Sequence, residues 1–421
     1  MGEHLLWGGI DTIELVHKFG SPLYVIDADA IVRNWRNMYS SITSRYQDSV
    51  ICYAYKANSH FAVCKMLRDL GAGAEVASGG ELYIALKVGV PTNRIVFDGP
   101  NKSASELAMA IESRVMINAD SLTEIERIQN IAAKLDTKTR VGLRVNPNIA
   151  VQTHPHLSTA LRQHKFGVPI ENAPEVCEVA SRQNMIDFAG LHTHLGSHIQ
   201  EVEPFCDACG KLLDLANLLR TKFGIEIKTL DLGGGISTPN TGSAETSFDE
   251  FAEAITNKLR SKIEDFDLGN ITLVLEPGRQ IVADSGVLLT EVGVVKRTPS
   301  VNWAIVDAGM NHLIRPALYG AYHKIAVANK MSSPAKEKYS VGGPCCESGD
   351  VLGEDRPFPG LEEGDLLAVF DVGAYGFTMS SNYNSYPRPC VVLVREGTPY
   401  VIRDRESYED LIRLERTPSF H

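Results

Sequence analysis

The sequence lacks long apolar runs and any excess of positive charge. It contains no stretch of about 18 consecutive apolar residues, the length that a transmembrane helix needs. Residues 1–7, MGEHLLW, lack the basic start and apolar core of a secretory signal, so we expect a cytoplasmic location. A formal net charge of -11 argues against nucleic acid or an anionic membrane as the main partner.

Disulfide spacing, repeats and low-complexity tracts are also missing. The 8 cysteines are scattered, apart from Cys206 and Cys209 and the adjacent pair Cys345 and Cys346, so no disulfide framework is predicted. Cys206 and Cys209 fall in a helical pattern without a second ligand pair, which is weak support for a metal or redox site. A chain of 421 residues with these properties indicates an enzyme or a small-molecule binder of two or three domains.

Short apolar runs alternate with amphipathic helices through the middle of the chain. The predicted strands are residues 50–56, 73–77, 94–98, 114–118, 140–145, 187–194, 227–232 and 271–276. Four helices carry capping-box start signals, at Ser78 with Glu81, Ser103 with Glu106, Ser121 with Glu124 and Ser247 with Glu250. About eight strand and helix units over about 240 residues have the size and period of a (β/α)₈ TIM-type barrel.

Polar residues end nearly every one of these runs. They are Lys56, Asp98, Asn118, Asn146, His194, the glycines after Leu232, and Glu276. In a doubly wound open sheet, which is the alternative fold, they would instead cluster at one switch point. The C-terminal strand ends of a barrel converge on one mouth, where barrel enzymes place their chemistry.

The chain after residue 285 has a different pattern. Alternating runs at 287–295, 303–307, 366–371 and 391–395 are separated by Gly, Pro and Ser clusters, which predicts an all-β domain of the sandwich or barrel-like kind. A strand at 22–26 precedes a helix at 28–45 and is expected to pair into this domain. The predicted domains are therefore 31–285, and 1–30 together with 286–421.

Three features in the barrel region suggest chemistry. Lys56 ends an apolar strand; it either reaches solvent or, in apolar surroundings, becomes the nucleophilic amine that a Schiff base requires. The run Gly233–Gly235 is either a plain turn or a phosphate cradle. Glu276 is either an ion-pair partner of Arg279 or a carboxylate that keeps a pyridine nitrogen protonated.

Two further motifs leave alternatives open. His192 and His194 share a strand face, as metal ligands of barrel hydrolases do, but Asp98 is the only obvious additional ligand. Otherwise His194 stacks on a planar ring and His192 packs in the core. Cys346 and Glu347 are either structural turn residues or a proton-shuttling thiol beside a carboxylate that recognises a substrate ammonium.

Together these motifs resemble the fold-type III pyridoxal-phosphate-dependent amino acid decarboxylases. The matching segments occur in the family's order: YAYKAN (53–58), HLGS (194–197), GGG (233–235), EPGR (276–279), CESGD (346–350) and GAYG (373–376). The resemblance covers nearly the whole chain. It is strongest to the branch that converts meso-diaminopimelate to L-lysine and carbon dioxide, the last step of lysine biosynthesis. The alternative is decarboxylation of ornithine, arginine or lysine.

The resemblance implies a role for each motif. Lys56 would carry the cofactor as a Schiff base, His194 would stack on its ring, and Cys346 would be the proton donor. The implied cofactor contacts are Lys56, His194, Ser197, Gly233, Gly234, Gly235, Glu276, Pro277, Gly278, Arg279 and Tyr375. The implied substrate contacts are Arg279, Arg315, Tyr319, Glu347 and Tyr375. The family also implies a homodimer in which Cys346 and Glu347 serve the partner's site. No metal is implied.

Two observations bear on substrate preference and on other functions. The segment from His156 to Leu161 resembles the family's substrate-facing loop, with Ala160 where glycine is expected. A metal-dependent barrel hydrolase would need bound zinc and would function without Lys56. A catalytically silent cofactor binder would be expected to lack the lysine or the thiol, and this chain has both.

Overall fold

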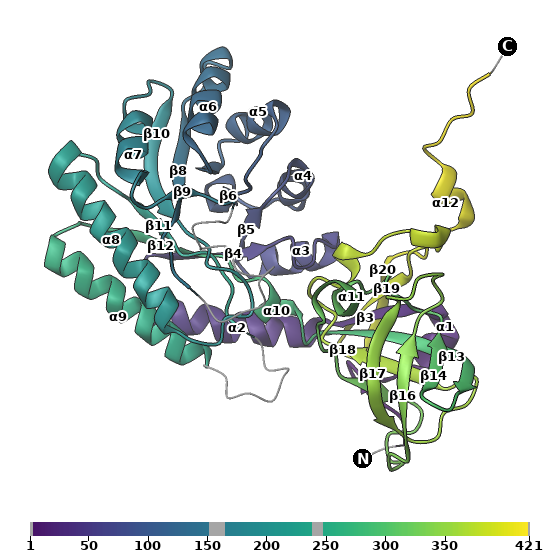
Figure 1. Ribbon diagram of the computed structural model, residues 1–421. Coiled ribbons are helices and arrows are strands. Elements are labelled where there is room, and N and C mark those ends of the chain that lie inside the picture. Colours follow the sequence, from purple (N-terminus) through teal and green to yellow (C-terminus); the bar gives the residue numbers. More distant parts are fainter. Residues whose placement is uncertain (1–2, 151–164, 238–246, 420–421) are drawn as a thin grey trace. The chain divides into compact units, whose positions relative to one another are not determined.

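The computed structural model describes residues 3–150, 165–237 and 247–419, which divide into two compact units (Figure 1). The barrel unit spans Arg33–Ile281, and the β unit combines Met1–Val32 with Val282–His421. The predicted substrate-facing segment 156–161 lies outside the described residues. None of the described helices is both long enough and apolar enough to cross a membrane.

The barrel unit contains eight parallel strands that close on themselves. They are β4 (Ser49–Ala54), β5 (Gly73–Val76), β6 (Ile95–Phe97), β7 (Met116–Ala119), β8 (Thr139–Asn146), β10 (Ile186–His192), β11 (Thr229–Asp231) and β12 (Thr272–Leu275). The barrel closes because β12 pairs with β4 and β8 pairs with β10. The short strand β9 (Val168–Pro169) lies parallel to β8 and pairs with its C-terminal end. The predicted TIM-type barrel is confirmed.

Helices surround these strands on the outside (Figure 1). They are α2 (Ala28–Thr43), α3 (Phe61–Asp69), α4 (Gly79–Val88), α5 (Ala104–Glu112), α6 (Leu122–Lys134), α7 (Ala173–Ser181), α8 (Glu203–Phe223), α9 (Phe248–Phe266) and the short α10 (Arg279–Val282), with the 3₁₀ turn η1 (Thr92–Arg94). Each longer helix turns a row of apolar side chains, such as Ile125, Ile128 and Ala132 of α6, toward the strands.

The predicted caps begin four of these helices in two different ways. At α5 and α9 both halves of the capping box form, with Ser103 and Ser247 as N-caps. At α4 and α6 the serine caps the helix, but the glutamate accepts from the residue before the serine: Glu81 from the Ala77 amide and Glu124 from the Asp120 amide. All four serines therefore satisfy backbone donors that the first helical turn leaves open.

The barrel interior is filled in its middle by an apolar plug, which consists of Cys52, Val96, Met116 and Val274 with Val50 packed against them. Space for the Met116 side chain comes from two glycines. A β-carbon at Gly190 would lie 2.7 Å from Met116 Cε, and one at Gly142 would lie 3.0 Å from the same atom.

The β unit is a nine-stranded sheet built from both ends of the chain. Its strands run in the order β17 (Val351–Phe358), β16 (Glu337–Gly342), β14 (Asn302–Val306), β13 (Gly286–Arg297), β3 (Leu23–Asp27), β19 (Cys390–Arg395) and β20 (Thr398–Arg403). Off this path, β18 (Leu366–Phe370) pairs with β13, and β15 (Ile325–Val327) pairs with β18. The N-terminal strand β3 therefore lies between two C-terminal strands, and the predicted all-β architecture is confirmed.

Short elements complete this unit. They are β1 (Leu6–Trp7), β2 (Ile10–Asp11), α1 (Thr12–Phe19), α11 (Arg315–Tyr319), η2 (Phe377–Met379), η3 (Tyr383–Ser385) and α12 (Tyr408–Ile412). The sequence analysis did not predict α1, although Asp11 caps it by accepting from the Ile13 amide. Leu15 of α1 packs into the core of the sheet with Leu23, Val287 and Val392.

The capping box of α5 makes a testable contribution to stability. Ser103→Ala removes the acceptor of the Glu106 amide and is expected to lower the free energy of unfolding by about 1 kcal/mol. The control is Ser105→Ala in the same helix, because among the described residues the Ser105 hydroxyl accepts from no backbone amide and contacts the hydroxyl of Ser103 at 3.1 Å. Urea unfolding of the three proteins measures the difference, and equal losses for both variants would contradict the capping argument.

Candidate active site

Lys56 lies just beyond the C-terminal end of β4, beside a buried carboxylate. Its Nζ is 2.7 Å from Oε2 of Glu75, whose side chain is fully buried. The parallel register of β4 and β5 aligns Ala54 with Glu75 and so brings the two groups together. The turn after β4 is held by Tyr53, whose hydroxyl donates to the carbonyl of Asn58 at 3.0 Å.

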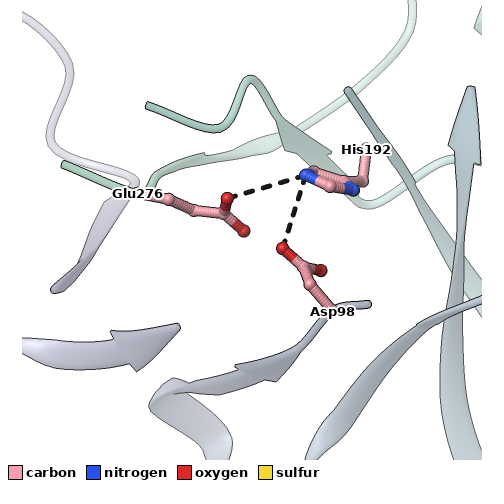
Figure 2. A group of neighbouring side chains, drawn as sticks. All are labelled: Asp98, His192 and Glu276. Carbon is pink, nitrogen blue, oxygen red and sulfur yellow. Dashed lines mark ion pairs between the residues drawn. The ribbon is translucent and has the colours of Figure 1, made fainter. Parts of the chain in front are cut away.

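Three more ionisable side chains meet at the ends of β6, β10 and β12 (Figure 2). His192 Nε2 lies 3.6 Å from Oδ2 of Asp98 and 3.6 Å from Oε2 of Glu276. The other Asp98 oxygen accepts from Nδ2 of Asn118 at 2.8 Å. Each of these side chains is nearly inaccessible to solvent. The predicted packing of His192 in the core therefore holds, but the ring packs among carboxylates.

Burial and mutual repulsion control the protonation of this cluster. Burial, followed by the charge of Asp98, raises the pKa of Glu276 well above its usual value. Burial and the charge of Glu276 do the same to the pKa of Asp231, which accepts from the Gly233 amide. Burial opposes ionisation of Asp98, yet the neighbouring His192 helps hold its pKa below the usual value. Asp98 is therefore the carboxylate that carries negative charge here.

His194 lies two residues beyond His192, and its ring is held as a neutral group. Its Nδ1 accepts from the Gly234 amide at 3.2 Å, which leaves any ring proton on Nε2. Desolvation, followed by the charge of Lys56, lowers its pKa well below the usual value. A neutral, oriented imidazole suits stacking on a planar ring, the role implied by the sequence.

The glycine run after β11 packs too tightly for side chains. A β-carbon at Gly234 would collide with the Glu276 carbonyl, and one at Gly235 would collide with the Gly196 carbonyl, next to Ser197. The Glu276 amide donates to the Gly233 carbonyl at 2.8 Å, which ties this run to the end of β12. The predicted residues Ser197, Gly233, Gly234, Gly235 and Glu276 therefore lie together.

The segment after β12 returns to the lysine strand. The Ala54 amide donates to the Pro277 carbonyl at 3.1 Å, and a β-carbon at Gly278 would lie 3.0 Å from that of Ala57. Arg279 begins α10 and is buried. Pro277, Gly278 and Arg279 are thus held against the turn that carries Lys56.

These residues fit a pyridoxal phosphate group. Both carboxylate oxygens of Glu276 are buried and have no hydrogen-bond partner among the described residues. Burial and the charge of Asp98 raise the pKa of Glu276, and a protonated pyridine nitrogen beside it would favour the ionised carboxylate and donate to one of these oxygens. The neighbouring amine of Lys56 and the close-packed glycines match the aldehyde and phosphate ends of such a group.

The β unit holds the other predicted residues in two groups. In the first, the guanidinium of Arg315 lies 5.3 Å from the ring centre of Tyr319 and 5.9 Å from that of Tyr375. Arg315 is buried on α11, and Tyr375 has a positive φ of 56° in the turn after β18. The two aromatic rings hold the guanidinium in a fixed orientation.

The second group is the turn containing Cys346 and Glu347. Both side chains are exposed. The turn is organised by the buried Asp350, whose carboxylate accepts from the amides of Met310 at 2.5 Å and Cys345 at 2.7 Å. Burial and then Asp350 raise the pKa of Cys345 to about 11, so Cys345 is the inert thiol of the adjacent pair.

The structure adds residues that the sequence analysis did not single out. Glu75 and Asp231 belong to the same buried layer as Glu276, each on the inward face of a short strand. Their sequence signal was a lone acidic residue within an apolar run. The metal-dependent hydrolase alternative expected His192 and His194 to bind one metal together. His192 lies with Asp98 and Glu276, whereas His194 accepts from the Gly234 amide of the glycine run, so the two histidines do not share one set of metal ligands.

Comparison with known proteins agrees with this geometry. Residues 28–283 match the family described as "Pyridoxal-dependent decarboxylase, pyridoxal binding domain". The diaminopimelate decarboxylase of Methanothermobacter thermautotrophicus is 42% identical over 99% of this chain and 96% of its own length. The diaminopimelate decarboxylase of Vibrio cholerae is 38% identical over 97% of this chain and 96% of its own length.

Solved structures give the same result. The diaminopimelate decarboxylase of M. jannaschii in complex with L-lysine has a TM-score of 0.92 at 39% identity, covering 99% of this chain and 96% of its own. The Helicobacter pylori enzyme with L-lysine has a TM-score of 0.90 at 38% identity, covering 96% and 99%. A lysine/ornithine decarboxylase from Vibrio vulnificus reaches a TM-score of 0.77 at 24% identity and shares the fold.

The buried Glu75 predicts a pH dependence of stability. Burial raises its pKa from 4.5 to about 7 although Lys56 opposes the shift, so the folded protein binds more protons than the unfolded chain between these values. Stability is therefore lost as pH rises through 7. In cofactor-free protein, Glu75→Gln is expected to remove this loss, which amounts to roughly 3 kcal/mol or less.

Thermal unfolding between pH 5 and pH 8 measures the effect. The parent is expected to lose more stability across this range than Glu75→Gln. The exposed Glu112→Gln on α5 is the matched control and should follow the parent. Parallel curves for the parent and Glu75→Gln would show that Glu75 does not titrate in this range.

Proposed function

The chain belongs to the family of pyridoxal-dependent decarboxylases, and on that basis we propose that it converts meso-diaminopimelate to L-lysine and carbon dioxide as a carboxy-lyase. The observation that carries the proposal is about 40% identity along the whole chain to enzymes of that activity, together with a complete set of the family's motifs. Decarboxylation of ornithine, arginine or lysine alone is not favoured, since the relatives at about 40% identity are diaminopimelate decarboxylases, whereas the lysine/ornithine enzyme is 24% identical.

Pyridoxal 5'-phosphate is the cofactor, and when bound it accepts the electron pair released from Cα of the substrate. We assign its attachment to Lys56, its pyridine nitrogen to Glu276 and its ring face to His194. Its phosphate is assigned to Ser197, the Gly233–Gly235 run, the Pro277–Arg279 segment and Tyr375. The packing of these barrel segments against one another supports this assignment.

Lys56 must exchange a proton during each turnover. An amine attacks only when it is unprotonated, and Lys56 Nζ has an acceptor, Oε2 of Glu75, at 2.7 Å. Because the pKa of Glu75 is raised to about 7, this carboxylate takes up and returns a proton near neutral pH. Glu75 therefore holds the Lys56 amine by a hydrogen bond and can exchange a proton with it.

The distal end of the substrate carries both an ammonium and a carboxylate. Arg279 and Arg315 are the proposed partners of the carboxylate, and Glu347 is the proposed partner of the ammonium. The Arg315 guanidinium lies 5.3 Å from the ring centre of Tyr319 and 5.9 Å from that of Tyr375, and a guanidinium suits a planar two-point contact with a carboxylate. Ornithine has no distal carboxylate, so its binding would leave this charge unmatched.

Cys346 is the proposed proton donor to Cα, and it acts together with Glu347 in the site of a second copy of the chain. Both side chains are exposed, unlike the buried Arg279 and Arg315. This difference supports a homodimer in which each active site is completed by the partner subunit. All 8 cysteines are free thiols, which supports a reducing compartment, the cytoplasm.

The function is tested with cofactor-loaded protein and four substrates in parallel: meso-diaminopimelate, ornithine, arginine and lysine. Release of L-lysine and carbon dioxide from meso-diaminopimelate alone is expected, and Lys56→Ala should abolish it. Reaction with another amino acid instead would keep the mechanism but overturn the assignment of Arg315 and Glu347. No reaction with any substrate, despite bound cofactor, would overturn the proposed activity.

The shared site predicts complementation between inactive variants. Lys56→Ala and Cys346→Ala are each expected to be nearly inactive alone. If they are unfolded together and refolded as a mixture, heterodimers should contain one intact site, which restores about a quarter of the parent activity. A mixture as inactive as its components would show that Lys56 and Cys346 act within one chain.

A further inference from the structure

The barrel has a second pocket at the opposite end from Lys56. Its volume is about 280 Å³, and it lies at the N-terminal ends of the strands. Three arginines line it: Arg94 directly before β6, Arg114 two residues before β7, and Arg140 near the start of β8. Three neighbouring strands therefore each bring one guanidinium group to this floor pocket.

The floor pocket is separate from the cofactor site. Its inner wall is the apolar plug, since Val50, Cys52, Val96, Met116 and Val274 all line it. The same strands that begin at the arginines end at the buried acidic layer, where β6 is followed by Asp98 and β7 contains Asn118. The floor pocket and the carboxyl-rich layer at the mouth are thus two separate polar ends of the barrel with an apolar layer between them.

The three arginines lack carboxylate partners. Among the described residues, Arg94, Arg114 and Arg140 form no ion pair, although the whole chain has a net charge of -11. Arg140 Nη2 donates to the hydroxyl of Thr229 across β10 at 3.3 Å. Arg94 Nη2 donates to the Gly71 carbonyl at 2.7 Å, while its Nε is buried and has no hydrogen-bond partner in the described parts of the chain.

The single acidic residue that lines the pocket is already engaged. Asp48 accepts from Nδ2 of Asn270 at 2.6 Å and from the hydroxyl of Thr272 at 2.9 Å. These donors are neutral and leave its charge in place, but in the described parts of the chain it forms no ion pair with the three arginines. Three guanidinium groups against one engaged carboxylate leave the floor pocket with an excess of positive charge.

We propose that the floor pocket binds a small anion with two negative charges, either phosphate or a short dicarboxylate. Arg114 and Arg140 provide charge-assisted hydrogen bonds, and guanidinium groups match the planar geometry of both kinds of oxyanion. The pocket volume lies just below the usual range for drug-sized ligands, which fits a small anion. The site is independent of the decarboxylation proposed above.

The test is a calorimetric titration of cofactor-loaded protein, in which the cofactor's own phosphate fills the cradle at the mouth. Inorganic phosphate and succinate are titrated separately at low ionic strength. Saturable binding of at least one of them is expected, and it should weaken as salt is added. Arg140→Gln and Arg114→Gln should each weaken it about tenfold or more, as expected for loss of a charge-assisted hydrogen bond.

The matched control is Arg182→Gln, because Arg182 is an exposed arginine of the barrel unit that pairs with Glu178. It should bind like the parent. Binding of phosphate but not succinate, or the reverse, supports the site and identifies the anion class. Absence of saturable binding for both anions overturns the proposal, and so does equal affinity of the parent, Arg114→Gln and Arg140→Gln. Thermal unfolding of the exposed Arg114→Gln variant verifies that it folds.

Discussion

The structure depends on how one barrel layer tolerates four buried carboxyl groups. Glu75, Asp98, Asp231 and Glu276 share this layer with the ammonium of Lys56 and the ring of His192. If all four carboxyl groups were ionised, the free-energy cost of removing their charges from water would exceed the attraction that the two basic groups provide. The layer is viable because burial raises the pKa values of Glu276 and Asp231, so that these groups keep their protons, while the neighbouring His192 helps hold the pKa of Asp98 low enough for it to ionise.

The sequence predicts most of this arrangement because a barrel converts strand ends into neighbours. Lys56, His194, the glycine run and Glu276 each end an apolar run, so closure alone brings them to the same mouth. Glu75 and Asp231 were missed for a related reason. Their strands have four and three residues, too few for an alternating pattern to show which face points inward.

Other details depend on contacts that distant residues make. Glu81 and Glu124 were predicted to close capping boxes with Ser78 and Ser121. Each glutamate instead accepts from the backbone amide of the residue before its serine, Ala77 or Asp120. In Glu124 the reason is visible, because the carboxylate also binds the buried ammonium of Lys102 at 3.0 Å. The residues alone left Cys346 and Glu347 open between a structural turn and a proton-shuttling thiol beside an ammonium-binding carboxylate, and the family motif favoured the second, since a turn of small and acidic residues carries no strand period.

The packing of Met116 against Gly142 and Gly190 has an evolutionary consequence. The thioether fills the volume that two absent β-carbons leave open, so the three positions do not vary independently. A β-carbon at position 190 would first meet the flexible end of Met116, at 2.7 Å, and then the backbone carbonyl of Thr229, at 3.0 Å. A larger residue at position 190 therefore requires the Met116 side chain to move or to shorten, so sequence changes at these two positions are coupled in their effect on stability.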